Sequence, residues 1–206
     1  MKQEQIKGKS CIHVTRYNVP YSILIYVISY SVRQLSHIFL FLGNSYLSQL
    51  TGCDSYKLRV ILTDTEGQSK NADYSYFKVD GPDFKYSLHI SGYSGTAGNY
   101  LYCIMWYVSW TNIYVAWKWY LSHLPINHDR DKFSTKDNDN DSHKDKSVNC
   151  ATMFKGGWWC SACHFVNLNG LYLNGTYTEY VVGKVWNKWK GYQYSFMKTK
   201  MMMRRN

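Results

Sequence analysis

Three alternating segments joined by short turns constrain the fold of this chain more than any other feature. Tyr56–Leu62, Asn71–Val79 and Phe84–Ile90 are rich in β-forming residues, and each alternates between apolar and polar positions. Thr63–Lys70 and Asp80–Asp83, which separate them, have the composition of turns. Strands joined by such short connections pair with their neighbours in opposite directions. The sequence therefore predicts an antiparallel meander.

Two segments of a different character follow the meander. Ser91–Asn99 has three glycines in nine residues and is predicted to form a tight loop. Tyr100–Leu121 is almost wholly apolar and aromatic, and its length would allow a transmembrane helix. However, Asn112, Lys118 and the many Trp and Tyr residues make a poor hydrocarbon span. We interpret residues 100–121 as an atypical apolar insertion, and the sequence leaves membrane association open.

The N-terminal residues 1–38 contain no motif that assigns them a fold or a function. Val19–Val32 is apolar and follows several basic residues, as in the central region of a secretion signal, but no convincing small-residue cleavage site comes after it. The sequence therefore divides into an unassigned segment, residues 1–38, and a single domain, residues 39–206.

The composition suits a folded, β-rich domain. Hydrophobic residues make up 45% of the chain and aromatic residues 17%, and flat rings pack well on pleated sheets. The formal net charge is +10, which would favour anionic partners. The basic residues are scattered apart from a small group at the C-terminal end, and no nucleic-acid-binding motif is present, so we predict no nucleic-acid partner.

Asp137–Asp141 is a run in which Asp and Asn alternate. Carboxylates at alternate positions of a loop can converge on one hard cation, and Ca²⁺ accepts six to eight oxygens. An EF-hand is excluded, because Ser142 and Val148 stand where its glycine and its bidentate glutamate are required. Spacing alone leaves two alternatives: a different kind of calcium loop, or a solvated acidic turn.

Cys150 and Cys163 bracket the turn and aromatic pair Gly156–Trp159. A disulfide between them would close a short loop and would stabilise the fold by about 3 kcal/mol. Two other interpretations compete for Cys163. Cys160–His164 has the C-x-x-C-H pattern of haem attachment, and together with Cys150 it offers three thiols and an imidazole for zinc.

No motif of a hydrolase or of a nucleotide-binding enzyme is present. His164 could act as a general base, but the sequence shows no nucleophile to accompany it. We therefore predict that the protein is not an enzyme.

Several ordered motifs resemble the fibrinogen C-terminal (fibrinogen-like) domain family, in particular its ficolin and tachylectin-type invertebrate lectin members. The motifs are Phe41–Asn44, Leu50–Thr51, Tyr56–Val60, Tyr93–Asn99, Lys132–Asp141, Asn149–Ala151, Gly156–Trp159, Cys163–His164, Asn167–Gly170, Trp186, Trp189, Lys190–Tyr192 and Tyr194–Ser195. The resemblance covers about Phe39–Asn99 and His123–Lys200 and implies an α+β fold. In this fold an antiparallel or mixed β-sheet is joined to a loop-rich C-terminal subdomain that binds calcium and a ligand.

The resemblance also implies a calcium site and a disulfide. The side chains of Asp139 and Asp141 correspond to calcium ligands, with the backbone carbonyls of His143 and Asp145 two and four positions further on. Cys150 and Cys163 correspond to the C-terminal disulfide of the family.

The implied ligand site follows the second cysteine of that disulfide. The peptide bond before Cys163 is often cis in the family, which would turn the backbone N–H groups of Cys163 and His164 toward a ligand carbonyl. In members that bind acetyl groups, aromatic side chains hold the methyl group, and the matching positions here are Phe154, His164, Tyr180 and Val181.

The function implied is that of a secreted, calcium-binding, lectin-like recognition domain that binds acetylated glycans, of the innate-immunity type. One alternative is an extracellular protein-interaction domain of the tenascin or angiopoietin type without a sugar site. Another is a nonfunctional truncated product, because residues 1–38 do not resemble the family's N-terminal subdomain. A homo-oligomer is left open, and Asn174–Thr176 forms an acceptor sequence for N-glycosylation.

Overall fold

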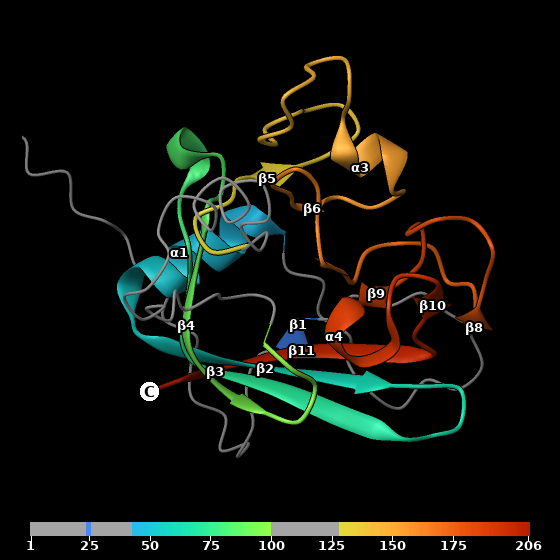
Figure 1. Ribbon diagram of the computed structural model, residues 1–206. Coiled ribbons are helices and arrows are strands. Elements are labelled where there is room, and N and C mark those ends of the chain that lie inside the picture. Colours follow the sequence, from blue (N-terminus) through green and yellow to red (C-terminus); the bar gives the residue numbers. More distant parts are fainter. Residues whose placement is uncertain (1–23, 26–42, 100–127) are drawn as a thin grey trace, which may run out of the picture.

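A five-stranded antiparallel sheet forms the main layer of the protein (Figure 1). The computed structural model describes residues 24–25, 43–99 and 128–206. The strands lie in the order β1-β11-β2-β3-β4. Their bounds are β1 (Leu24–Ile25), β2 (Tyr56–Thr63), β3 (Ser69–Val79), β4 (Leu88–Gly95) and β11 (Lys198–Arg205). The predicted antiparallel meander is confirmed by the pairing of β2 with β3 and of β3 with β4.

Alternation along β2 decides which face of the sheet is buried. Leu58, Val60 and Leu62 point into the core, with exposed fractions of 2% or less, since successive side chains of a strand point to opposite faces. Arg59 lies on the other face, where its Nε is 2.7 Å from a carboxylate oxygen of Asp73 on β3. A register slip of one residue would exchange the two faces, so this pattern fixes the pairing.

The third predicted strand begins later than expected. Pro82–Phe84 forms a short 3₁₀ helix, η1, and the next two residues, Lys85 and Tyr86, have φ values of 55° and 54°. This left-handed conformation is incompatible with a strand. The strand β4 therefore starts at Leu88 and continues to Gly95, and Ser91–Gly95 is a strand where the glycines predicted a loop.

The strand β11 and the helix α1 (Asn44–Cys53) were not predicted. All eight residues of β11 pair with β2, and Met201 and Met203 are buried in the core. In α1 the buried residues are Leu47, Leu50 and Thr51, which lie on one helical face because of their three- and four-residue spacing. The Thr51 hydroxyl accepts a 3.0 Å hydrogen bond from the backbone of β3.

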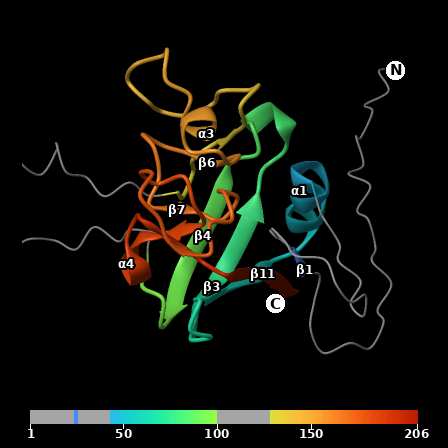
Figure 2. The same ribbon diagram turned by 90° about the vertical axis from the view of Figure 1, so that its right-hand side faces the viewer.

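The remaining part of the chain consists of short elements connected by ordered loops. They are β5 (Phe133–Ser134), α3 (Cys150–Met153), β6 (Trp158–Trp159), β7 (Val166–Asn167), β8 (Gly175–Thr176), β9 (Val185–Trp186), α4 (Asn187–Lys190) and β10 (Tyr194–Ser195). The antiparallel pairs are β5 with β6, β7 with β9 and β8 with β10, and a parallel bridge joins Leu171 to Gly183. This region adjoins the β4 side of the sheet (Figure 2), where residue 131 accepts a backbone hydrogen bond from Leu88. The α+β fold class is confirmed.

The predicted insertion, residues 100–121, lies outside the described residues, as does most of Val19–Val32. Among the helices that the structure does describe, none is long and apolar enough to cross a membrane.

Candidate functional site

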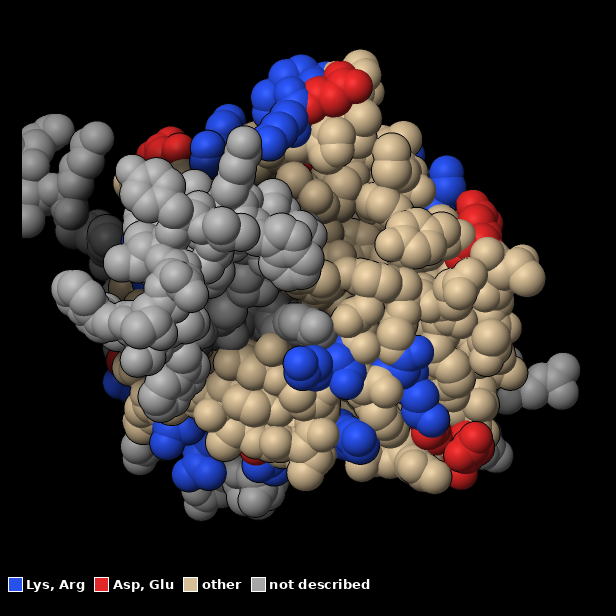
Figure 3. Space-filling view, in the orientation of Figure 1, with Lys and Arg blue, Asp and Glu red and all other residues tan. Residues whose placement is uncertain are grey.

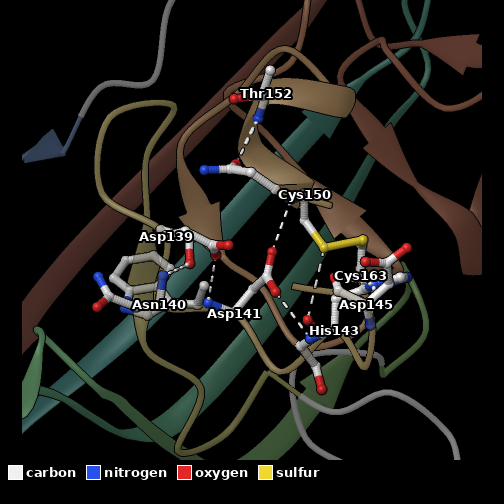
Figure 4. The surroundings of a disulfide bond; sticks show 12 residues. Asp139, Asn140, Asp141, His143, Asp145, Cys150, Thr152 and Cys163 are labelled. Carbon is white, nitrogen blue, oxygen red and sulfur yellow. Dashed lines mark hydrogen bonds between the residues drawn. A yellow bond between two sulfur atoms is a disulfide. The ribbon is translucent and has the colours of Figure 1, made fainter. Parts of the chain in front are cut away.

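The acidic loop is held in place by its own carboxylates (Figure 4). Asp139 accepts a 3.1 Å hydrogen bond from the backbone N–H of Asp141. The Asp141 side chain is buried, and its two oxygens accept the N–H groups of His143 at 2.9 Å and of Cys150 at 2.8 Å. Asp141 thereby ties the loop to the first residue of α3. Hydrogen bonds to a carboxylate are stronger than neutral ones, so this contact defines the shape of the loop.

The implied calcium ligands fit this loop only in part. Asp139 and Asp141 supply two neighbouring carboxylates, and their oxygens can accept more than one partner each. The Asp145 carbonyl accepts the N–H of Val148 at 3.1 Å. It also lies 3.0 Å from Nδ1 of His143, which accepts the N–H of Asp145 at 3.2 Å. No three His, Cys, Asp or Glu side chains converge anywhere in the described part of the chain. The two aspartates suit a cation, and the Asp145 carbonyl, which has two lone pairs, keeps one beside the Val148 bond.

The disulfide implied by the resemblance is present. Cys150 and Cys163 are bonded to each other, and the Ala162–Cys163 peptide bond is cis (Figure 4). The zinc and haem interpretations are wrong, because the disulfide uses Cys163, which both require, and also Cys150, which the zinc set requires. Cys160 is a free, buried thiol, and burial raises its pKa to about 12. Cys53, for which the resemblance supplies no partner, is also disulfide-bonded.

His164 is a buried imidazole with no hydrogen-bond partner among the described residues. Its exposed fraction is 5%, and neither ring nitrogen bonds to a residue in the described ranges. The ring meets Phe154 edge to face, with 4.8 Å between the centroids. Burial lowers the pKa of His164 to about 3, so the imidazole is neutral at physiological pH. Buried polar groups are rarely left unsatisfied, and one beside an aromatic ring suggests a ligand.

The backbone beside His164 also presents unused donors. The N–H groups of Cys163 and His164 donate to no acceptor among the described residues, whereas the carbonyl of Cys163 accepts the N–H of Ser161 at 2.8 Å. The two donors are consecutive and lie next to the cis peptide bond. An amide or carboxyl oxygen is the kind of acceptor that such a pair would bind.

Tyr180 and Val181 occupy a second part of the site. Val181 is buried at a φ of 62°, and the neighbouring Tyr180 is 63% exposed. The Tyr180 ring lies 5.8 Å from that of Tyr192, which stacks on Phe165 at 6.1 Å. The structure therefore forms two aromatic groups, Phe154 with His164, and Phe165 with Tyr192 and Tyr180. His164 and Phe165, one from each group, are consecutive in the chain.

Tyr192 and Phe165 were missed as site residues in the sequence. Tyr192 belongs to the Lys190–Tyr192 motif of the resemblance and lies twelve positions beyond Tyr180, and spacing could not show that their rings meet. The position of Phe165 directly after His164 was the available signal.

The lysine and arginine side chains on the face shown in Figure 3 form several separate groups. Their distribution does not trace a continuous basic groove on that face, and the site described above is built from neutral aromatic and backbone groups.

An antiparallel sheet is joined in this protein to aromatic-rich loops that a disulfide holds. Residues 31–206 match the family described as fibrinogen beta and gamma chains, C-terminal globular domain. The chain belongs to this family. The match begins before Phe39 and thus includes part of the segment that the sequence left unassigned.

Relatives and solved structures agree with this assignment. The chain is 37% identical to Techylectin-5A of Tachypleus tridentatus over 79% of its own length and 47% of that protein. It is 41% identical to Fibrinogen-like protein 1 of Mesocricetus auratus over 80% of its length and 48% of that protein. The chain thus spans about half the length of these relatives.

Two solved structures share the fold. The fibrinogen-like globe domain of human ANGPTL6 has a TM-score of 0.65 and 32% identity, over 81% of this chain and 64% of that one. Lamprey fibrin D-dimer has a TM-score of 0.65 and 33% identity, over 79% of this chain and 49% of that one, and it was solved with the peptide ligand Gly-His-Arg-Pro-amide.

Proposed function

We propose that this protein is a secreted, lectin-like recognition domain that binds acetylated glycans through Phe154, Cys163, His164, Tyr180 and Val181. The observation that supports this most directly is the buried His164, whose ring nitrogens have no partner within the described residues. Tyr192 joins the proposed site through its ring contact with Tyr180. The similarity to a protein named Techylectin-5A supports the same class of ligand.

The chemistry of an acetamido group suits this arrangement. Its carbonyl oxygen can accept the N–H groups of Cys163 and His164. Its methyl group is apolar and would pack against the Phe154–His164 pair, whose rings meet edge to face with their centroids 4.8 Å apart. The exposed ring of Tyr180 offers a flat apolar surface to the sugar itself. A few converging polar groups within an apolar lining are typical of small-ligand sites.

Calcium would act on this site indirectly. We propose that the side chains of Asp139 and Asp141, with the carbonyl of His143, hold a Ca²⁺ ion together with water. The charge of the ion would hold the acidic loop in one conformation. Asp141 would then restrain the backbone of Cys150, whose N–H it accepts at 2.8 Å. Cys150 is bonded to Cys163, so a stable loop positions the backbone donors.

Secretion is proposed from the cysteines. Structural disulfides form and persist in oxidising compartments, and here one joins α3 to the segment that precedes His164.

The test is binding of the secreted protein to a resin that carries N-acetylated sugar, first with Ca²⁺ and then with a chelator. We expect retention in calcium, release by free acetylated sugar and loss of retention in the chelator. His164→Ala and Tyr180→Ala should each abolish or weaken retention. Tyr46→Ala is the matched control, because Tyr46 is a similarly exposed tyrosine on α1, at 56% against 63% for Tyr180. Equal retention of His164→Ala and the unmodified protein would exclude this site.

A protein-interaction domain without a sugar site is the second candidate. The peptide ligand bound to the lamprey relative favours it, since a related fold accepts a peptide in that structure. The two functions separate in the same experiment. Absence of sugar retention, with the Cys150–Cys163 bond confirmed by mass mapping, would favour a protein partner. Absence of sugar retention together with absence of the Cys150–Cys163 bond would show that the chain does not fold.

A further inference from the structure

The segment after β7 places three consecutive apolar side chains on the surface. Leu171, Tyr172 and Leu173 are 41%, 38% and 36% exposed, and we call them the LYL patch. Their backbone is fixed: Leu171 pairs with Val182 and with residue 184, and Leu173 donates to the hydroxyl of Ser195. The side chains therefore cannot turn inward, and exposed apolar clusters of this kind usually have a cover or a partner.

Asn174 follows this patch and is presented for modification. It is exposed and occupies a turn with a φ of 51°. Its Oδ1 accepts a 3.1 Å hydrogen bond from the hydroxyl of Tyr172, and its Nδ2, the atom that carries an N-linked glycan, donates to no residue in the described ranges. An attached glycan would leave the Tyr172 bond intact.

The Tyr172 ring is positioned to contact such a glycan. The Nζ of Lys184 lies 5.1 Å from the ring centroid and holds one of its faces, and the hydroxyl holds its edge next to Asn174. We place the apolar side of the first sugar against the opposite face. An aromatic ring that is already held in one position contributes more to the contact with a sugar, because it loses little conformational freedom when the contact forms.

The chain has a second acceptor sequence, Asn140–Ser142, which serves as an internal comparison. There the asparagine Nδ2 donates a 2.9 Å hydrogen bond to the carbonyl of Phe133. The central residue, Asp141, is buried and bonded to α3. A sugar on the Nδ2 of Asn140 would have to fit beside the Phe133 carbonyl to which this atom is bonded, whereas the Nδ2 of Asn174 has no partner among the described residues.

We propose that Asn174 carries an N-linked glycan whose first sugars cover the LYL patch, and that Asn140 stays unmodified. The proposal does not depend on which ligand the protein binds.

The experiment uses the full 206-residue chain secreted from a eukaryotic cell. Peptide N-glycosidase in isotopically heavy water converts a glycosylated asparagine to a labelled aspartate, and peptide mapping then locates it. We expect the label at Asn174 and none at Asn140. Thr176→Ser should keep the glycan, while Thr176→Ala and Asn174→Gln should lose it, and Asn140→Gln should keep it. A secreted protein with unmodified Asn174, or with a glycan at Asn140, would overturn the assignment.

The covering role has a separate readout. Thr176→Ala retains Asn174 and its bond to Tyr172, so it removes the glycan with little change to the fold. We expect this variant to bind more of an apolar fluorescent dye and to self-associate more, and we expect Leu171→Thr added to it to reverse part of both effects. Equal dye binding by Thr176→Ala and the glycosylated protein would show that the glycan does not cover the patch.

Discussion

The β-sheet and the loop-rich region 128–196 keep their shapes by different means. In the sheet, long strands place alternate apolar residues such as Val60 and Phe77 in one core. In the loop region no element exceeds four residues, and single polar side chains hold the backbone. Asn167 donates to the carbonyl of Phe154 at 3.1 Å and Asn169 to that of Gly157 at 2.7 Å. A sheet distributes its stability over many residues, whereas these loops depend on a few.

The largest effect is expected from the sheet. Phe77→Ala removes a ring with an exposed fraction of 0% and should lower the free energy of unfolding by about 3–5 kcal/mol, since it leaves a cavity in the core. Urea denaturation of the variant and of the parent protein measures this difference in the free energy of unfolding. Tyr76→Ala is the control on the same strand, because its side chain is 39% exposed and should change stability by only about 0.5 kcal/mol. Similar losses for both would contradict the division into core and surface faces.

Removal of the disulfide should affect mainly the loops. The free energy of unfolding of the double variant Cys150→Ala/Cys163→Ala should be lower by about 3 kcal/mol, because the unfolded chain has more conformational freedom without the cross-link. Hydrogen exchange should show faster amide exchange in residues 139–164 and little change in β2 and β3. Equal loss of protection in the sheet would mean that the two regions unfold as one unit.

A single carboxylate should matter next. Asp141→Asn keeps the size of the side chain and loses charge-assisted hydrogen bonds to His143 and Cys150, which should cost about 2 kcal/mol. Asp139→Asn affects one N–H group on an exposed side chain and should cost less. Thermal unfolding in a chelator compares the two without a contribution from calcium. A larger loss of thermal stability in Asp139→Asn than in Asp141→Asn would mean that Asp139, and not Asp141, is the main support of the loop.

The smallest effect is expected from pH, because contributions of opposite sign partly cancel. Burial lowers the pKa of His164 from 6.5 to about 3 on folding and that of His128 from 6.5 to about 4. The unfolded chain therefore binds more protons, and stability falls as pH decreases from 6.5 toward 3. The pKa of Asp131 rises from 3.8 to about 7 through burial and the charge of Asp129. Here the folded chain binds more protons, and stability falls as pH rises from 3.8 to 7.

His164→Phe separates these contributions, since it keeps a ring against Phe154 and removes the titrating group. Urea denaturation at about pH 7 and about pH 5 should show that the variant loses less stability on acidification than the parent protein. An unchanged difference between the two pH values would mean that His164 is accessible to protons in the folded state.

The sequence predicted the sheet from periodicity, and its errors have local causes. Alternation in Tyr56–Leu62 was sufficient for β2. The start of β4 was misplaced because Phe84–Ile90 also alternates, while the turn at Lys85 and Tyr86 depends on two positive φ values that no residue type signals there. The strand β11 was missed because three successive methionines do not show the alternation of buried Met201 and Met203.

The site was predicted by a different route. No periodic pattern exists between Cys150 and Val181. Spacing suggested the Cys150–Cys163 disulfide but left the zinc and haem interpretations beside it, and the cis peptide bond came from family resemblance alone. What resemblance to the quoted motifs could not supply was contact between distant positions. The pairing of Tyr192 with Tyr180 depends on how two loops cross, and the engagement of the Asp145 carbonyl depends on the turn that Val148 closes.

The pairing of β11 with β2 has a consequence for biosynthesis. The two strands are joined residue by residue, Tyr56 with Arg205 and Thr63 with Lys198, across a separation of more than a hundred positions in the chain. During translation β2 leaves the ribosome long before its partner exists, and one edge of that strand stays open until the last pairing residues emerge. Long-range pairings form late and slowly, and an unpaired edge can capture another chain. The nascent protein therefore needs protection from aggregation until synthesis has passed residue 205.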